Sequence, residues 1–374
     1  MSNRIKIVCV VSVRPNFMKA APIVEAFRAY PEVELLLAHT GQHYDDGMSG
    51  IFFRELGLPR PDVNFGIGTG TRVEKVAETM KAFERFCLRE KPDAAIVGGD
   101  VDGTLACGLA AAQLGLKLLH VEAGLRSFDR TMPEELNRTA VDALADLLFC
   151  SEKDAVDNLR REGIPDGRIF FVGNVMIDAL VKSLPLARRL DAPKKYGLRP
   201  KEYATVTLHR PAAVDDPDAL AGVVGALLEI QRETPLLFPV HPRAAARLDA
   251  FGLRAKLEHA PNITLLEPLG YLEFLALNAD AKLVLTDSGG LQEEALALGV
   301  PCVTVRDNTE RPVTCELGGN RLAGLTPDGI LRAYRDALDA ERTPPKLPEL
   351  WDGRAAERIA QTAVERLRQL EKRA

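Results

Sequence analysis

The sequence predicts an α/β protein made of two Rossmann-like domains, each built around a parallel sheet. Three observations support this: the length of 374 residues, the alternation of short apolar runs with helical patterns, and a polar, basic interruption at 187–202. A chain of this length holds about two ordinary domains. Strands that alternate with helices at this spacing are typical of right-handed βαβ units, which build parallel sheets.

The elements fall into two series, one on each side of the interruption. In the first series, strands are predicted at Lys6–Val11, Glu34–Thr40, Ala94–Val97, Lys117–Val121, Leu147–Cys150 and Ile169–Val172. Helical patterns lie between them at Phe17–Tyr30, Val73–Glu90 and Asp102–Leu114. In the second series, strands are predicted at Tyr203–Leu208, Leu236–Val240, Ile263–Leu265, Lys282–Thr286 and Cys302–Val305. We therefore expect an N-terminal domain at 1–172 and a C-terminal domain at 173–353, with a charged helix at 354–374 packing back on the first.

Composition narrows the classes of function. A hydrophobic content of 46% and a charged content of 27% fit a globular protein, and the formal net charge of −5 gives no electrostatic basis for binding nucleic acid or acidic membranes. The first apolar run is too short to span a bilayer and lacks a cleavage site, so neither a signal peptide nor an anchor is predicted. The six cysteines form no CxxC pair, which argues against a zinc site or a disulfide framework and favours a reducing cytoplasm.

Acidic side chains follow two of the predicted strands. Asp100 ends the run AAIVGGD, Glu122 follows KLLHV, and Glu134 lies in the next turn of HVEAGLRSFDRTMPEELNR. The carboxyl ends of parallel strands are where open α/β sheets bind ligands, and acids that share a site shift each other's pKa. We therefore predict a group of proton donors and acceptors at this edge. Simple pairing of these acids with the arginines of the same segment is the alternative.

A glycine-rich turn in the second half predicts an anion site. In VLTDSGGLQEEALALG, a buried strand is followed by Ser288, Gly289 and Gly290 and then directly by a helix. Glycines let backbone N–H groups approach a ligand, and a helix N-terminus attracts phosphate. Glu294, one turn further on, is placed to reach paired hydroxyl groups. An ordinary strand-to-helix turn is the alternative.

Further candidates for anion or ligand contacts lie in loops after predicted strands. Arg14 and Lys19 follow the first strand, His209 closes the first strand of the second domain, and Arg311 lies in RDNTERP. A guanidinium offers a planar fork and an ammonium a point charge to phosphate oxygens. Solvated surface positions are the alternative for the cations, and a structural role is the alternative for the histidine.

Eight ordered blocks carry a resemblance to a known family: RPNFMKAAP, TGQHYDD, GGDVDGT, HVEAGLRSFDRTMPEELNR, GNVMIDAL, TLHRP, LTDSGGLQEE and RDNTERP. Over roughly 4–324 the chain resembles the non-hydrolysing UDP-N-acetylglucosamine 2-epimerases. The resemblance implies a GT-B architecture, in which two Rossmann-like domains face each other across a cleft. It also implies a homodimer that interconverts UDP-GlcNAc and UDP-ManNAc by eliminating and re-adding UDP through a glycal. That path uses no metal and no redox cofactor, so none is expected.

The resemblance also assigns roles to individual positions. It places Asp100, Glu122 and Glu134 in the proton-transfer group and His209 beside them, without deciding which acid removes the proton and which returns it. Contacts with the UDP-sugar are assigned to Arg14, Lys19, Leu269, Phe274, Ser288, Gly289, Gly290, Glu294 and Arg311. Some relatives bind a second UDP-GlcNAc as an activator, and the matching segments here contain Gln42, His43, Glu135, Arg210 and His241.

The chain departs from the usual family pattern at several positions near these blocks. Ser12-Val13 stand where Gly-Thr is frequent, and Asn16 stands where Glu is frequent. Ala212-Ala213 replace a pair that is commonly polar, and Asp102-Gly103, beside Asp100, replace small hydroxyl or amide residues. These differences bear on which sugar is bound. A UDP-2,3-diacetamido uronic acid is the alternative substrate. A GT-B glycosyltransferase and a silent nucleotide-sugar sensor are the alternative functions.

Overall fold

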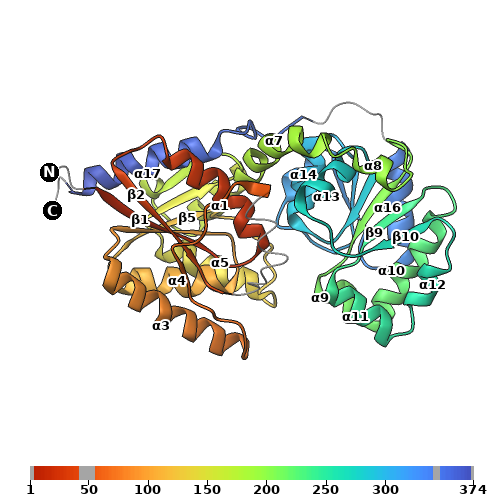
Figure 1. Ribbon diagram of the computed structural model, residues 1–374, viewed down its shortest axis with the longest axis horizontal. Coiled ribbons are helices and arrows are strands. Elements are labelled where there is room, and N and C mark those ends of the chain that lie inside the picture. The colour runs from red at the N-terminus through yellow and green to blue at the C-terminus, as the bar shows by residue number, and fades with distance from the viewer. Residues whose placement is uncertain (1–3, 42–54, 340–345, 372–374) are drawn as a thin grey trace. The chain divides into compact units, whose positions relative to one another are not determined.

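The computed structural model describes residues 4–41, 55–339 and 346–371 of the chain, which forms two compact units. Unit 1 comprises Met1–Val181 together with Glu349–Ala374, and unit 2 comprises Lys182–Pro348. Each unit has its own parallel sheet with helices on both faces (Figure 1). The prediction of two Rossmann-like α/β domains is confirmed.

Unit 1 is built on a seven-stranded sheet in which every pairing is parallel, in the order β3-β2-β1-β4-β5-β6-β7. The strands are β1 (Ile5–Val11), β2 (Val33–His39), β3 (Val63–Asn64), β4 (Ala94–Gly98), β5 (Lys117–Val121), β6 (Leu147–Cys150) and β7 (Ile169–Phe171). Their central members are apolar and buried, as expected for strands covered on both faces. The order of the strands reverses direction between β1 and β4.

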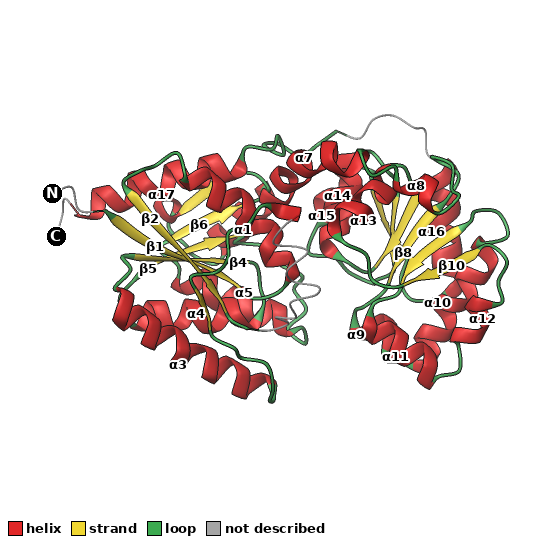
Figure 2. Cartoon of the chain, viewed as in Figure 1, coloured by secondary structure: helices red, strands yellow, loops and turns green. Residues whose placement is uncertain are grey.

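The helices of unit 1 lie on the two faces of this sheet. They are α1 (Arg14–Phe27), α3 (Arg72–Glu90), α4 (Asp102–Gln113), α5 (Pro133–Leu144), α6 (Lys153–Arg161), the 3-10 turn η1 (Asp166–Arg168), α7 (Val175–Arg188), which continues into unit 2, and α17 (Ala355–Glu371). Helices α1 and α17 pack together on one face, and α3, α4 and α5 cover the other (Figures 1 and 2).

Unit 2 repeats this plan with a six-stranded parallel sheet in the order β10-β9-β8-β11-β12-β13. The strands are β8 (Ala204–Thr207), β9 (Leu236–Pro239), β10 (Ile263–Leu266), β11 (Leu283–Thr286), β12 (Cys302–Thr304) and β13 (Asn320–Leu322). The helices are α8 (Ala192–Lys195), α9 (Pro211–Val214), α10 (Pro217–Ile230), α11 (Pro242–Ala250), α12 (Arg254–Glu258), α13 (Tyr271–Ala279), α14 (Gly289–Leu298), α15 (Pro312–Glu316) and α16 (Pro327–Asp339). The strand order reverses between β8 and β11.

Three details differ from the elements expected from the sequence. Strands β3 and β13 were not predicted, because two or three residues are too few to show a strand pattern. Helix α1 starts at Arg14 rather than Phe17, with Pro15 in its first turn, where a missing N–H costs nothing.

The C-terminal helix is attached to unit 1 by specific contacts. Asp178 on α7 accepts hydrogen bonds from the backbone N–H groups of Ala355 (3.1 Å) and Ala356 (2.7 Å), and so caps α17 from elsewhere in the chain. The indole N–H of Trp351 donates to the carbonyl of Ser151 at 3.1 Å. Burial raises the pKa of Asp178 to about 6, although the two backbone hydrogen bonds oppose that rise.

Within the described residues, every helix is too short or too polar for a bilayer-spanning segment. The six cysteines are free thiols, and all except Cys315 are buried.

Candidate active site

Several of the candidate residues follow the strands between which the strand order reverses in each sheet. In open α/β sheets such a reversal leaves a crevice at the carboxyl ends of the two strands on either side. In unit 1 these ends lead into Ser12 after β1 and into Asp100 after β4. In unit 2 they lead into His209 after β8 and Ser288 after β11.

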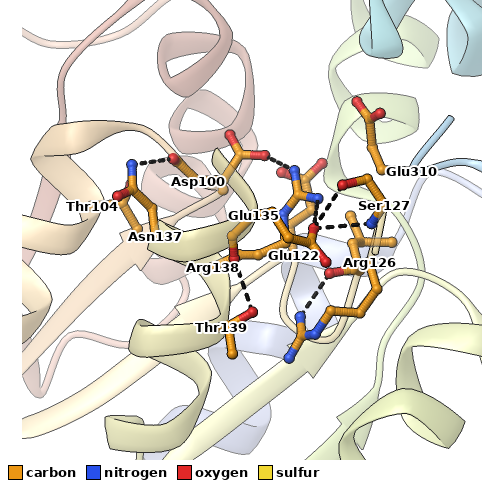
Figure 3. A network of polar contacts seen from close by, with 12 residues as sticks. Asp100, Thr104, Glu122, Arg126, Ser127, Glu135, Asn137, Arg138, Thr139 and Glu310 are labelled. Carbon is orange, nitrogen blue, oxygen red and sulfur yellow. Dashed lines mark hydrogen bonds and ion pairs between the residues drawn. The ribbon is translucent and has the colours of Figure 1, made fainter. Parts of the chain in front are cut away.

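Asp100 is half-buried and is held from two sides by helix α5. Its carboxylate pairs with the guanidinium of Arg138, and its backbone carbonyl accepts a hydrogen bond from the side-chain amide of Asn137 at 2.8 Å. Figure 3 shows both contacts, which continue through Arg138 to Glu135. A fixed guanidinium beside a carboxylate favours its charged form.

Glu122 follows β5 directly and is buried with 7% of its surface exposed. Its backbone takes a left-handed conformation, with a φ of 69°, which is uncommon for a residue with a side chain. The carboxylate pairs with the ammonium of Lys19 on α1. This pair lies over the backbone of Gly99, where an added Cβ would come within 2.7 Å of Lys19 Nζ and 3.1 Å of Glu122 Oε2. The second acid therefore lies over the residue that precedes Asp100.

The two acids at the start of α5 behave differently. Glu134 is half-buried in the first helical turn. Glu135 is buried and accepts hydrogen bonds from the backbone N–H and hydroxyl of Ser127 (2.9 and 3.0 Å), the backbone N–H of Phe128 (3.0 Å) and the guanidinium of Arg138 (2.7 Å). Glu135 thus fixes the loop before α5 and orients the arginine that pairs with Asp100 (Figure 3).

In unit 2, His209 is backed by a buried acid. Its Nδ1 lies 2.8 Å from Oδ1 of Asp287, and the other carboxylate oxygen accepts the backbone N–H groups of His209 and Arg210, each at 2.7 Å. Burial favours the neutral form of Asp287, but these contacts outweigh it and keep the pKa of Asp287 below its usual value. The imidazole itself remains partly exposed, so its ring is oriented and still accessible within its unit.

The glycine turn after β11 leads directly into α14. Ser288 is the N-cap residue, its backbone N–H donates to the hydroxyl of Thr286 at 2.9 Å, and the helix begins at Gly289 and Gly290. A Cβ on Gly289 would lie 2.5 Å from Oε1 of Glu310, so a larger residue there would displace that carboxylate. The backbone N–H groups of this first turn have the arrangement that binds anions.

Glu294 lies one turn further along α14 and is buried. Burial raises the pKa of Glu294 to about 8, although the phenol of Tyr271 donates a hydrogen bond to it at 3.2 Å and opposes that rise. This bond links α14 to α13, and the half-buried Leu269 and Phe274 lie just before and within α13.

Arg311 and Arg210, the two candidate arginines of unit 2, form ion pairs with acids. The Nε of Arg311 lies 2.7 Å from Glu293 Oε1, and Nη2 of Arg210 lies 3.3 Å from Glu310 Oε1. Glu310 is buried, yet its pKa is held well below the usual range, because the charges of Arg306 and Arg210 outweigh the effect of burial.

The positions suggested for an activator are only partly described. His241 caps α11 through a hydrogen bond from the backbone N–H of Arg243 (3.2 Å), and its ring centre lies 5.6 Å from that of His209. Gln42 and His43 lie outside the described residues, as does the side chain of Arg14.

Several supporting residues were not assigned from the sequence. Arg138 and Asn137 follow Glu134 by about one helical turn, and that spacing was a usable signal. Asp287 follows β11, and His209 follows β8, which is the neighbouring strand. The two residues meet only because of this strand order, which cannot be read from the sequence.

Taken together, unit 1 presents carboxylates beside fixed cations, and unit 2 presents an oriented imidazole and a helix N-terminus. The first arrangement can exchange protons and the second can hold a phosphorylated group. Within the described ranges, no group of three histidine, cysteine or acidic side chains is placed to hold a metal ion.

Two α/β units, each with its own parallel sheet, place the chain in the GT-B fold class, which the solved relatives share. The sequence profile of the family described as UDP-N-acetylglucosamine 2-epimerase matches residues 25–363. The chain belongs to this family.

Named relatives agree with that assignment. A UDP-N-acetylglucosamine 2-epimerase of Methanococcus maripaludis is 42% identical over 342 residues, which cover 90% of this chain and 93% of the relative. The UDP-2,3-diacetamido-2,3-dideoxy-D-glucuronate 2-epimerase of Pseudomonas aeruginosa is 40% identical over 89% of this chain and 92% of its own length. Among solved structures, the Methanocaldococcus jannaschii UDP-GlcNAc 2-epimerase in complex with UDP-GlcNAc and UDP superposes with a TM-score of 0.91, at 40% identity and with 96% and 99% of the two chains covered.

Proposed function

We propose that this chain interconverts UDP-GlcNAc and UDP-ManNAc by inverting C2 of the sugar. The observation that carries the proposal is the pairing of Glu122 with Lys19 and of Asp100 with Arg138 where the strand order of unit 1 reverses. Membership of the family and the solved relative that binds UDP-GlcNAc and UDP support the same substrate.

The reaction proceeds by elimination and re-addition. A carboxylate takes the C2 proton while the C1–O bond to UDP breaks, which leaves a C1–C2 double bond in the sugar and releases the diphosphate as an anion. An acid then returns a proton to the opposite face of C2, and the diphosphate oxygen attacks C1 again. We assign proton transfer to Asp100, Glu122 and Glu134, and we assign His209, oriented by Asp287, to the same reaction.

Lys19 and Arg138 have a defined part in this chemistry. Each is a cation paired with one acid and favours the carboxylate, which is the form that can accept a proton. Asp100 and Glu122 lie on adjoining turns, and we assign removal and return of the proton to the pair rather than to either acid alone.

We assign binding of the nucleotide to the remaining positions. The α14 N-terminus at Ser288, Gly289 and Gly290 receives phosphate, with Arg14, Lys19 and Arg311 as cations. Glu294 accepts from the ribose hydroxyls, and Leu269 and Phe274 contact the uracil.

A second substrate has specific support. The Pseudomonas aeruginosa relative, named for a UDP-2,3-diacetamido uronic acid, is nearly as similar to this chain as the relatives named for UDP-GlcNAc. The same elimination would invert C2 of either sugar, so relative kcat/KM values on the two UDP-sugars decide between them.

The assembly, location and regulation of the enzyme belong to the same proposal. We propose that the enzyme acts as a homodimer in the cytoplasm. We also propose that a second UDP-GlcNAc binds as an activator, and we assign its contacts to Gln42, His43, Glu135, Arg210 and His241. A rate curve in UDP-ManNAc that is hyperbolic and responds to UDP-GlcNAc only by product inhibition would argue against this activator.

The deciding experiment is a proton NMR time course with UDP-GlcNAc in D2O. The proposal expects deuterium at C2 and formation of UDP-ManNAc without net release of UDP. A glycosyltransferase would leave the substrate unchanged without an acceptor, and a sensor would leave it unchanged under all conditions. If solvent deuterium enters neither UDP-sugar at C2, the proposed reaction is wrong.

A further inference from the structure

We propose that His120, a buried histidine on β5, is a positioning residue held as an imidazolium, which fastens the two turns that carry Asp100 and Glu122. The inference rests on the proposed function only in so far as those two acids act on the sugar. The charge state of the histidine is a separate matter that can be measured without substrate.

The ring of His120 is fully buried, and both of its nitrogens have partners. Nε2 lies 2.8 Å from the backbone carbonyl oxygen of Gly99, and Nδ1 lies 2.6 Å from Oδ1 of Asp142 on α5. A carbonyl oxygen only accepts hydrogen bonds, so Nε2 must carry a hydrogen.

The second proton follows from the surroundings of Asp142. Its other oxygen, Oδ2, accepts the backbone N–H of Gly124 at 3.0 Å and lies 2.8 Å from Nη1 of Arg126. Arginine stays charged in proteins, so the contact of Arg126 favours the ionised carboxylate of Asp142 against the effect of burial. A charged carboxylate only accepts, so Nδ1 donates as well and the ring is an imidazolium.

The charges around the ring alternate in sign. Asp142 lies between His120 and Arg126, and Arg126 in turn binds Glu162 through two hydrogen bonds of 2.7 and 2.6 Å. From β6, the thiol of Cys150 faces the same charges. A buried cation needs such paired neighbours, because an uncompensated charge in the interior is very costly.

The two ends of this network lie in the turns that carry the acids. Gly99 immediately precedes Asp100, has a φ of +67° and donates its N–H to the carbonyl of Val121 at 3.0 Å. Gly124 follows Glu122 by two residues and has a φ of +82°, and a Cβ there would overlap the carbonyl oxygen of Ala155. Through Asp142, one imidazolium therefore fixes both turns.

Rigid turns of this kind matter for turnover rather than for binding. A displacement of a reacting group by about 1 Å can lower a rate on the order of 10²-fold. Because His120 contacts the backbone of the turns and not the nucleotide positions, its loss should appear in kcat and leave KM close to the wild-type value.

The first experiment measures the charge state directly. Protein labelled with 15N-histidine is studied by NMR at neutral pH, and the signals of His120 are assigned by their absence in His120→Gln. We expect both ring nitrogens to show the protonated signature. A signal from one unprotonated ring nitrogen overturns the imidazolium, whatever the activity.

The second experiment separates positioning from packing. His120→Leu fills the space without a donor, whereas His120→Gln retains one N–H for the Gly99 carbonyl. We expect the leucine variant to lose turnover on the order of 10²-fold with KM little changed, and the glutamine variant to recover part of that loss. A folded leucine variant with wild-type kcat overturns the positioning role.

Asp142→Asn serves as the matched control if the leucine variant does not fold. Its amide NH2 can donate to a neutral His120 while its carbonyl accepts from Gly124 and Arg126, so the contact with Gly99 is kept. We expect a neutral ring by NMR and most of the wild-type turnover. Loss of turnover despite an intact Gly99 contact would overturn the argument. If the wild type epimerises no UDP-sugar, the proposed function fails, while the NMR measurement still decides the charge of the ring.

Discussion

The acids at the strand ends of the two units differ in what they face. In unit 1, Glu122 and Asp100 each meet a side-chain cation, Lys19 and Arg138. In unit 2, Asp287 meets an imidazole and two backbone N–H groups, and Glu294 meets a phenol. An acid beside a fixed cation keeps its charge, and the contacts of Asp287 lower its pKa in the same direction, whereas burial raises the pKa of Glu294 and favours its proton. We therefore expect the acids of unit 1 to exchange protons and those of unit 2 to orient or bind other groups.

The largest expected effect comes from exchanging one acid in each unit. Glu122→Gln should lower kcat about 10²–10³-fold, comparable to removing a preorganised charge from an active site. Binding of UDP should be kept or tightened, because Lys19 loses the acid that neutralises it. Glu294→Gln should instead leave kcat unchanged and alter UDP binding by no more than about 1 kcal/mol, since the protonated acid and the amide each offer a donor and an acceptor.

Rates of C2 deuterium exchange and titration calorimetry with UDP measure the two effects. Glu84→Gln, an exposed position on α3, is the control. If Glu122→Gln turns over at the wild-type rate, Glu122 takes no part in the chemistry. If both variants lose UDP affinity alike, the division of labour between the units is wrong.

The second prediction concerns the protonation of Glu294. Its pKa is raised from the model-compound value of 4.5 to about 8, so the folded protein holds a proton that the unfolded chain releases in this range. The contribution of this raised pKa to the free energy of unfolding is fully present below about pH 4.5 and is lost as the pH rises towards 8. Glu294→Gln should therefore be more stable than the wild type in mildly alkaline buffer, by an amount on the order of a few kcal/mol, and lose that advantage in acid.

Melting temperatures of the two proteins across this pH range measure the effect, with the exposed Glu233→Gln of the same unit as control. A difference between wild type and Glu294→Gln that stays constant with pH would show that Glu294 is ionised in the folded state.

The third prediction tests whether Ser12 and Gly103 of unit 1, which both depart from the family pattern, share one packing space. A Cβ on Gly103 in α4 would overlap the hydroxyl of the buried Ser12 and lie 3.1 Å from Thr40 Cγ2. Gly103→Ala should therefore cost about 1–3 kcal/mol of stability. Adding Ser12→Gly should restore much of it, because the overlapping hydroxyl is removed.

A double-mutant cycle by chemical denaturation gives the coupling energy. In unit 2, a Cβ on Gly225 within α10 meets nothing within 4 Å, so Gly225→Ala should stabilise by about 0.4–1 kcal/mol. Additive effects of Ser12→Gly and Gly103→Ala would mean that the two positions do not share one space.

The last prediction concerns the cap of α17, where a small effect is expected. Asp178→Ala removes the acceptor for two backbone N–H groups and should cost about 1 kcal/mol, as other caps do. Asp178→Asn keeps an acceptor and should cost less. Limited proteolysis of the C-terminal helix, combined with melting temperatures, checks this, and equal losses in the two variants would show that burial rather than capping sets the effect.

Much of this architecture could be predicted from the sequence because the buried strands are apolar and the helices between them are long. The glycine turn before α14 and the acids after β4 and β5 were visible as local patterns. Pairing of these acids with the arginines of the same segment was the alternative interpretation, and Asp100 does pair with Arg138. The pairing of Glu122 with Lys19 was not visible, because the two residues are far apart in the chain and meet only through the strand order. Asp287 and the buried His120 remained hidden for the same reason. Their roles depend on which strands are neighbours in the sheet, and the hydrophobic periodicity of the sequence does not predict strand order.

The return of α17 to unit 1 has a consequence for synthesis. Ile359, Ala363 and Val364 on this helix are buried in the unit, and α17 packs on α1 near the start of the chain. The ribosome makes α17 only after all of unit 2. The hydrophobic face of unit 1 that α17 covers therefore stays exposed to solvent while the middle of the chain is translated. Unit 2 is continuous in sequence and can complete itself first, which reverses the usual order in which the N-terminal domain is finished before the next.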